Sequence, residues 1–496
     1  MGLLKNYGRK DIVEIRSYLV DLVNSLCDKY EKKWTDRNES DIGMFFVELS
    51  AGVADMLNYQ IDMSVREAYL PTARQRKNIK RILALANYRM KGPVAAVSSA
   101  TFSLTRDVDT DILIPKYTQI AYRSVTGNIY FATSEDCEIL LGQTSVKVPI
   151  QQGIVNNINL ISGDLKTSPA FEILSSNVAE DSVRLIVGDE EWTQVEDALT
   201  DEEYGTKFSV RENDEDHPYL EFGPMYRSFL PADDSTPVLI QYIDTDGDNG
   251  VVQKGTITSI EDMIVVNNVN YASVISVTNT EPSSGGAARE TIETAKRKAP
   301  EWVSSRDNMC TLTDYRVEAE HCNGIYRAAA VDWNVSWDGT EGYFVSVPYQ
   351  VRVFLMPADS DAYECNDTLT QNVYDVLAKR LWCSIKLSIE PAYVKIIDVV
   401  GTIYTRESSE IHYKLKYDAE NAIKEFFKKE NREFAESYTV GNIEHLIISS
   451  NNKIDYCELT TPTSTINLSP VEFPKLGNLD LKVVRQTGIR EVVKDA

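Results

Sequence analysis

The stretch that decides the N-terminal fold is SDIGMFFVELSAGVADMLNYQ, residues 40–60. Its apolar residues recur every three or four positions, and the pattern continues to Val65, which is typical of an amphipathic helix over about 40–69. Ser40 or Asp41 can cap this helix by accepting hydrogen bonds from its first free N–H groups. A helix of nearly seven turns is about 40 Å long, so we expect it to leave the body of its own subunit or to join a helix bundle.

Two further helices are predicted beside this one. Residues 10–33 have apolar side chains at helical spacing with charges between them. Pro71 ends the long helix, and the run from Thr72 to Gln75 has the pattern of a capping box that opens a third helix. Gly92-Pro93 ends the helical region, so we expect residues 1–92 to form an N-terminal helical region.

The hydrophobic period changes to two from about residue 97, and the chain reads as nearly all strand and turn to about 280. We expect a β domain made of residues 93–170 and 251–290. Residues 171–250 include an acidic interval punctuated by Gly and Pro, and we expect them to form an inserted β subdomain.

Strands and helices alternate in the last third of the chain. The patterns predict a strand at 349–355, a helix at 367–382, two strands within 385–405, a helix at 411–429 and a strand at 479–484. This order suggests α+β domains at 291–400 and 401–496, with helices on one face of a sheet. The expected fold class is therefore α+β multidomain, with an N-terminal long-helix region, a central mostly β domain carrying an inserted β subdomain, and C-terminal α+β domains.

Composition points to a protein partner. The 496 residues hold 51 Lys and Arg against 75 Asp and Glu, a net charge of −24. Such a chain repels nucleic-acid phosphates and anionic lipid headgroups, so we expect no nucleic-acid partner. The 26 tyrosines and 6 tryptophans are residues that suit protein interfaces. No stretch of 18 apolar residues occurs, so no membrane span is expected.

The sequence offers weak signals for chemistry. The seven cysteines are scattered without a CxxC pair, which indicates free, mostly packed thiols in a reduced compartment. His321 and Cys322 are adjacent, but neighbours usually point apart, so a partly buried pair near a helix end is the favoured interpretation over a thiol with its base. The acidic run at 189–191 is more typical of a solvated face than of paired catalytic carboxylates.

One acidic loop has some features of a calcium site. Asp244, Asp246 and Asp248 place oxygens at loop positions 1, 3 and 5, but Gly255 stands where a bidentate Glu belongs. A tight turn that uses Asp and Gly geometry is therefore favoured. We predict no catalytic residue, no metal site and no cofactor.

A basic cluster marks the third predicted helix of this acidic chain. It consists of Arg74, Arg76, Lys77, Lys80 and Arg81. A solvated helix face explains such a cluster, and so does an electrostatic contact with an acidic neighbour, including the acidic part of another copy.

The long-helix stretch, residues 40–60, resembles the opening motif of the baseplate J-like family, the wedge proteins of contractile phage tails and related injection machines. Ile42 replaces the usual Pro of that motif. Further pieces similar to the family follow in order at 67–73, 114–120, 220–223, 247–255, 284–286, 305–307, 312–315 and 472–477. The inserted region favours the T-even-type wedge subunit over its shorter relatives.

The resemblance implies a structural role in the baseplate of a virion tail, for a protein made in the host cytoplasm. It implies that two copies pair and that their N-terminal helices bundle with a helix of another wedge protein. Six wedges would then close a ring around the hub, the C-terminal domains would contact neighbours, and the ring would transmit its rearrangement on contraction. The family has no enzymatic residues to carry over. By position, the bundle face would be Phe45, Leu49, Val53, Met56, Leu57 and Ile61.

Other possibilities remain open from the sequence. Arg74, Arg76 and Lys80 could face the sheath initiator or a neighbouring wedge. A receptor- or glycan-binding tail β protein that uses 171–250 is the alternative function, and a hydrolase with a carboxylate pair is a third.

Overall fold

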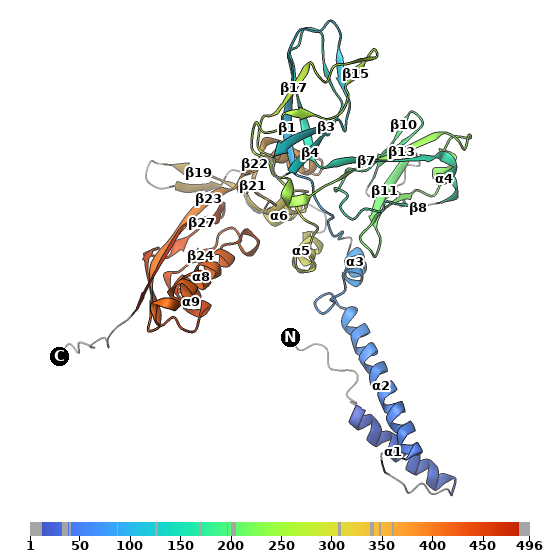
Figure 1. The fold of residues 1–496 in the computed structure, drawn as a ribbon, viewed down its shortest axis with the longest axis vertical. Coiled ribbons are helices and arrows are strands. Elements are labelled where there is room, and N and C mark those ends of the chain that lie inside the picture. Colours follow the sequence, from blue (N-terminus) through green and yellow to red (C-terminus); the bar gives the residue numbers. More distant parts are fainter. Residues whose placement is uncertain are drawn as a thin grey trace, which may run out of the picture. The chain divides into compact units, whose positions relative to one another are not determined.

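The computed structural model describes residues 12–31, 38, 41–86, 88–124, 127–168, 170–195, 197–199, 205–305, 309–337, 342–346, 349–359 and 362–485. The chain divides into two compact units. The first unit is residues 1–90 with 290–303, and the second unit is residues 91–289 with 304–496. Within the described residues, the structure has N-terminal helices, a central mostly β region and C-terminal α+β elements, which confirms the predicted fold class (Figure 1).

Two helices of the first unit form a hairpin. α1 (Ile12–Lys29) packs against the N-terminal half of α2 (Ile42–Glu67). Asp41 caps α2, since its carboxylate accepts hydrogen bonds from the N–H groups of Gly43 at 2.8 Å and Met44 at 3.3 Å. The predicted long helix and its cap are confirmed.

A second helix pair completes the first unit. α3 (Arg76–Ala84) packs against α5 (Ile292–Ser305), whose residues up to Val303 belong to this unit. Ile79 and Leu83 of α3 are buried together with Ala295 and Ala299 of α5. The chain thus returns to the helical unit after the central sheets, and residues 291–303, expected at the start of the α+β domain 291–400, belong to the first unit.

The predicted capping box at the start of α3 is wrong. The Thr72 hydroxyl donates backwards to the carbonyl oxygens of Arg66 and Tyr69, at 2.7 and 3.2 Å. The N-cap residue of α3 is Gln75, and its side chain makes no capping hydrogen bond.

Glu67, the last residue of α2, caps α3 instead. Its carboxylate accepts hydrogen bonds from the N–H groups of Arg74 and Gln75 at 3.0 and 3.1 Å and from the Asn78 amide at 2.9 Å. These contacts lower the pKa of Glu67, with the Asn78 amide as the largest cause. The same contacts fix the direction in which α3 leaves α2.

The first sheet of the second unit has the strand order β14-β3-β4-β6-β1-β17 within the described residues. Its strands are β1 (Val97–Leu104), β3 (Gln119–Ser124), β4 (Gly127–Thr133), β6 (Ser145–Gln152), β14 (Ser259–Ile260) and β17 (Ile275–Asn279). Two short antiparallel pairs accompany it, β2 (Ile112–Ile114) with β5 (Cys137–Ile139) and β15 (Val265–Val266) with β16 (Val269–Asn270). Phe102, Ile120 and Phe131 are fully buried in its core.

The second sheet has the order β7-β13-β9-β10-β11-β12-β8. Its elements are β7 (Ile154–Ile161), α4 (Ser162–Thr167), β8 (Ala170–Glu172), β9 (Arg184–Val187), β10 (Glu190–Gln194), β11 (Lys207–Glu212), β12 (Pro218–Phe222) and β13 (Pro237–Asp244). Its core contains Trp192, Phe208 and Leu220. Since β7 pairs with β13 along its whole length, this sheet begins at Ile154, earlier than the insert boundary predicted at 171.

The C-terminal part contains two three-stranded sheets, β18-β21-β22 and β25-β23-β27. Helices α6 (Leu312–His321) and α7 (Asp367–Ala378) pack with β18 (Ile325–Val331), β21 (Gln350–Pro357) and β22 (Lys386–Pro391). Helices α8 (Ser409–Phe426) and α9 (Val440–Ser450) cover one face of β23 (Tyr393–Thr405), β25 (Tyr456–Thr461) and β27 (Glu472–Arg485) (Figure 1). Two short pairs are β19 (Trp333–Trp337) with β20 (Gly342–Ser346) and β24 (Ser437–Tyr438) with β26 (Ile466–Asn467). Strand β23 runs across the boundary predicted at 400, and α9 was not predicted.

A buried carboxylate joins the C-terminal part to the Gly-rich turn. Asp359 follows β21, and its Oδ2 accepts a hydrogen bond from the Gly285 N–H at 2.6 Å. The buried Lys429 ammonium donates to the backbone carbonyls of Asp359 and Ala362, both at 2.6 Å. Burial raises the pKa of Asp359 to about 6, because it removes water from the charged form.

We predict that Asp359→Asn changes how stability depends on pH. An unfolded Asp titrates near 4, so a folded pKa of about 6 means that protonation stabilises the fold at low pH and that this stabilisation is lost as the pH rises through 6. Asn does not titrate. The native chain should therefore lose about 1 kcal/mol of unfolding free energy through this group as the pH rises from 5.5 to 8, and the variant should not show this loss. Urea unfolding at both pH values measures this difference, with Asp375→Asn on the exposed side of α7 as the control. Parallel pH curves for the Asp359 variant and the native chain would contradict it.

We predict that Glu67→Ala frays the start of α3. Loss of the carboxylate leaves the Arg74 and Gln75 N–H groups without their acceptor, so amide exchange at 74–78 should accelerate while exchange in α5 stays unchanged. The lowered pKa of Glu67 means that its stabilisation is present above the ordinary pKa and is lost as the pH falls through the lowered value. Hydrogen-exchange mass spectrometry tests both points, with Asp62→Ala on α2 as the control. Equal exchange at 74–78 in the two variants would refute the capping role.

Candidate interaction surface on the N-terminal helices

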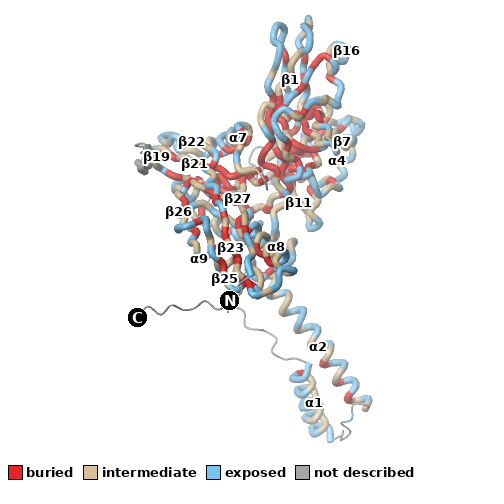
Figure 2. The backbone as a smooth tube through the Cα atoms, turned by 60° about the vertical axis from the view of Figure 1, so that its left-hand side comes forward, coloured by how far each residue is buried: buried red, intermediate tan, exposed pale blue. Residues whose placement is uncertain are grey.

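The α1–α2 hairpin has an apolar core that covers only one side of α2. Ile15 of α1 and Met44, Val47 and Ala51 of α2 are buried where the helices meet. Arg16 and Glu48 form an ion pair at 3.0 Å beside this contact. Within the described residues, the buried apolar side chains of the hairpin lie near one end of α2, and Figure 2 shows the rest of α2 as exposed or intermediate.

A second apolar side of α2 is uncovered. We define the exposed α2 face as the residues Phe45, Leu49, Val53, Met56, Leu57 and Ile61. Each of these side chains is at least half exposed, from 50% for Val53 to 66% for Met56. Steps of three and four residues place them along one stripe of the helix. These are the residues that the sequence analysis assigned to a helix bundle.

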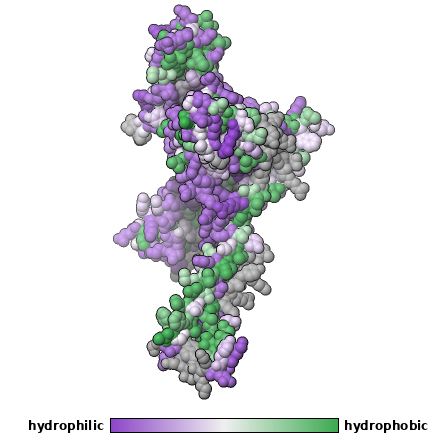
Figure 3. Space-filling model, turned by 90° about the vertical axis from the view of Figure 1, so that its right-hand side faces the viewer, coloured by the Kyte–Doolittle hydropathy of each residue, from purple (hydrophilic) through white to green (hydrophobic). Residues whose placement is uncertain are grey.

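Other apolar side chains widen this surface. They are Val13, Leu22 and Leu26 of α1 and Ile42, Phe46 and Tyr59 of α2, all exposed by 41% or more. The space-filling view shows the result as a nearly continuous hydrophobic surface over the two helices (Figure 3). Contiguous apolar patches of this extent mark protein–protein contacts, because monomeric soluble proteins rarely leave them in water.

Charge is distributed unevenly between the two units. By sequence, the first unit has 18 Lys and Arg against 15 Asp and Glu, a net +3, whereas the second unit has 33 against 60, a net −27. The overall charge of −24 therefore comes from the second unit. With a net charge of only +3, the first unit by itself repels another copy of that unit only weakly.

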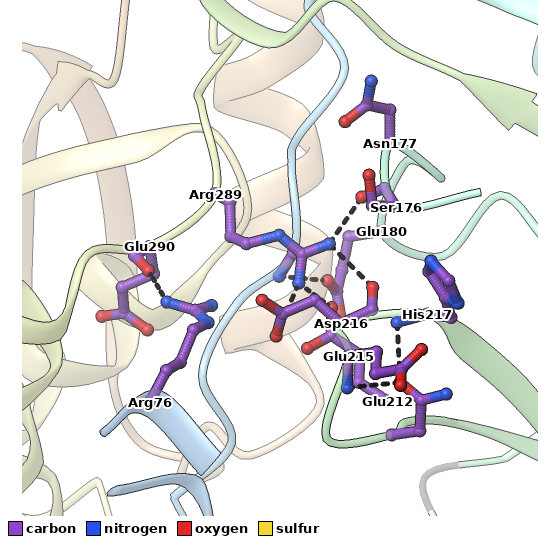
Figure 4. A network of polar contacts seen from close by, with 12 residues as sticks. Arg76, Ser176, Asn177, Glu180, Glu212, Glu215, Asp216, His217, Arg289 and Glu290 are labelled. Atoms are coloured by element: carbon purple, nitrogen blue, oxygen red, sulfur yellow. Dashed lines mark hydrogen bonds and ion pairs between the residues drawn. The ribbon is translucent and has the colours of Figure 1, made fainter. Parts of the chain in front are cut away.

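The predicted basic cluster is only partly available for contacts. Arg76 is half-buried, and its Nη1 donates to the Glu290 carbonyl at 2.6 Å within the first unit. Lys80 is also half-buried, while Arg74, Lys77 and Arg81 are exposed. Arg76 thus holds the backbone at Glu290 next to α3 (Figure 4), a role that the spacing of charges in the sequence did not reveal.

Cys322 and Asp244, which the sequence analysis considered as reactive or metal-binding residues, make hydrogen bonds within the fold. Cys322 is buried at the end of α6, where its Sγ donates to the Glu318 carbonyl, and burial raises its pKa to about 12. A thiol with this pKa stays protonated at neutral pH and is a poor nucleophile. Cys322 therefore lacks the thiolate character of a reactive cysteine.

The acidic loop after β13 is a turn. Residues 247–250 form a short 3₁₀ turn, and the Asp244 carboxylate accepts hydrogen bonds from Asn156 at 2.8 Å and Ser175 at 2.7 Å. Over the described ranges, no group of three or more His, Cys, Asp and Glu side chains is arranged to hold a metal ion. Among the described helices, none combines the length and apolar character needed to span a bilayer.

Comparison with known proteins gives one match to a family. Residues 14–85 match the family model described as "Bacteriophage baseplate protein, N-terminal domain". No curated protein matches the chain. One matching solved structure is described as "Cryo-EM structure of the anti-feeding prophage (AFP) baseplate, 6-fold symmetrised". It has 13% identity, 94% coverage of this chain, 90% coverage of that chain and a TM-score of 0.30, a likeness that carries no argument by itself. The region that holds the exposed α2 face is thus similar to the N-terminal domain of bacteriophage baseplate proteins, and this match supports a structural role in a baseplate.

Proposed function

We propose that this chain is a structural wedge component of a contractile-tail baseplate and that it assembles through the exposed α2 face. The observation that carries the proposal is a coincidence of two findings. The residues matched by the baseplate family model, 14–85, include the whole of the uncovered apolar surface on α2. The uncovered apolar surface of α2 therefore lies in the region that resembles baseplate proteins.

The shape of the surface favours helices as partners. A two-helix hairpin buries too little apolar area to be stable alone, whereas helix bundles enclose stripes of this kind on all sides. Two copies supply four helices, and a further helix from another wedge protein can complete the bundle. The steps of three and four residues along Phe45, Leu49, Val53 and Met56 suit packing of side chains between neighbouring helices.

The remaining parts of the proposal rest on the family resemblance. Six wedges form a ring around the hub, the C-terminal α+β domains contact neighbouring wedges, and the ring transmits its rearrangement when the tail contracts. The exposed Arg74, Lys77 and Arg81 face an acidic partner, either the sheath initiator or a neighbouring wedge. The role is structural, and no catalytic step is assigned to any residue.

We predict that the double variant Leu49→Glu/Val53→Glu abolishes association and leaves the fold intact. Both side chains are half exposed, so charges there cost little in the single chain but are desolvated when another helix covers them. Size-exclusion chromatography with light scattering should give the native chain a mass above the 55.9 kDa of one copy and the variant a mass equal to it. The melting temperature should change by only a few degrees.

Met263→Glu provides the matched control. Met263 is 75% exposed and lies in the second unit, so its substitution adds a charge to an exposed apolar site outside the helices and should leave the mass unchanged. A native chain that is a monodisperse monomer and also ignores every co-expressed wedge partner would overturn the proposal.

A further inference from the structure

Two aromatic rings and two lysines lie at one end of the sheet that contains β21 and β22. We call this set the Trp382 patch, and it consists of Tyr349, Lys379, Trp382 and Lys386. β21 and β22 run parallel, so both begin at this end, and the Lys386 N–H donates to the Tyr349 carbonyl at 2.8 Å. Trp382 opens a tight turn into β22, in which its carbonyl accepts from the Ile385 N–H at 3.0 Å. Lys379 is the C-cap residue of α7, three residues before Trp382, so the four residues are neighbours where α7 leads into β22.

Both rings of the patch are exposed, although the chain beside Trp382 is anchored. Trp382 is 60% exposed and Tyr349 is 73% exposed. Leu381 and Ile385, on either side of the turn, pack against the core that α6 and α7 share with this sheet. The backbone that carries the indole is therefore held in place, and the indole itself is left in water. Large rings on such a backbone lose little conformational freedom when a partner covers them, which makes them effective contact residues.

Tyr349 also has an unusual backbone conformation. Its φ is +61°, in the left-handed region that bulky side chains rarely adopt. This conformation costs about 1 kcal/mol or more in a residue that has a Cβ. Within the described residues, the ring makes no hydrogen bond and no ring contact that would offset the cost. A glycine would suit this backbone better, so a contact of the ring outside the single chain explains why a tyrosine is present.

The two lysines form a cationic site in a strongly acidic unit. The second unit has a net charge of −27, whereas residues 376–389 contain three cations and no acidic residue. Arg380 is engaged within the fold, because it pairs with the buried Glu318 at 3.1 Å. Lys379 and Lys386 are exposed, and over the described ranges neither of them forms an ion pair. Two ammonium groups are therefore available to carboxylates from outside the chain.

We propose that the Trp382 patch is a docking site for an acidic polypeptide segment of another protein. The carboxylates of the segment pair with Lys379 and Lys386, and its apolar side chains pack against the two rings. A polypeptide is favoured over nucleic acid because the charge of the second unit repels a phosphate backbone, whereas a short acidic segment interacts mainly with the lysines beside it. The patch belongs to the second unit, so the proposal goes beyond association through the exposed α2 face and does not depend on it.

Peptide binding to the full chain tests the proposal. The probe is a fluorescein-labelled peptide with equal parts of Asp, Glu and Leu, and fluorescence anisotropy measures its dissociation constant. We expect a value of about 100 μM or tighter, which weakens at least about tenfold in the variant Lys379→Glu/Lys386→Glu. The same peptide with Asn and Gln in place of its acids should also bind at least about tenfold more weakly. Lys147→Glu/Lys254→Glu is the matched control, because it makes the same change of charge at two other exposed lysines of the second unit and should leave the affinity within about twofold.

Substitution of the rings separates binding from stability. Tyr349→Gly removes a ring and relieves the left-handed backbone, so the urea midpoint of unfolding should stay equal or rise while the peptide binds about threefold more weakly. Trp382→Ala should weaken binding about tenfold. Tyr413→Ala, which removes an 81% exposed ring of α8, is the control and should leave binding unchanged.

Four outcomes would refute the docking site. The first is that the acidic peptide does not bind, and the second is that the native chain and the variant of Lys379 and Lys386 bind it equally. The third is that the peptide with Asn and Gln binds as tightly as the acidic one, or that an oligothymidine binds more tightly, which would favour nucleic acid as the occupant. The fourth is that Tyr349→Gly and Trp382→Ala both retain the full affinity, which would exclude docking against the rings.

Discussion

One apolar side of α2 is in contact with water, and this exposure is the constraint on which the proposed assembly depends. Burial of apolar surface stabilises a fold by about 25 cal/mol per Å², and this helix forgoes that gain along most of its length in the single chain. α1 covers Met44, Val47 and Ala51, and the opposite stripe has no cover within the described residues. A helix with this pattern is explained by a partner, whereas a helix that served only its own unit would need a polar outer side.

The two units differ in net charge and in the amount of apolar surface that the helices leave exposed. The helical unit has nearly balanced charges and an apolar surface, which suits association, whereas the second unit has the excess of acidic residues and well-packed sheets with their own cores. Within the second unit, the Asp359 carboxylate holds the Gly285 turn, and Arg289 donates to the Glu212 carboxylate of the second sheet. The uncovered apolar surface and the large sheets thus belong to separate units of the chain.

Local signals explain what could be predicted from sequence. The long helix, its Asp41 cap and the exposed α2 face follow from spacing within one segment, because a stripe of apolar residues is visible without tertiary information. Glu67 as the cap of α3 was missed because its partners lie seven to eleven residues away across a turn, and the return of α5 to α3 depends on packing between distant segments. Asp359 acts singly, just after a strand, where no periodic pattern marks it. The capping-box prediction at Thr72 was wrong because the Thr72 hydroxyl donates to the carbonyl oxygens of Arg66 and Tyr69 at the end of the preceding helix.

The most direct test of the account is the concentration dependence of amide exchange along α2. Peptides that cover residues 42–67 report whether another helix shelters this segment, and the same samples supply β13 as an internal reference. If two copies of the chain cover each other, protection of α2 should rise by about threefold for each tenfold increase in protein concentration once the dimer predominates, while β13 stays constant. Full protection of α2 in a sample whose mass by light scattering is that of one copy would show that the chain covers this side by itself and would contradict the central claim.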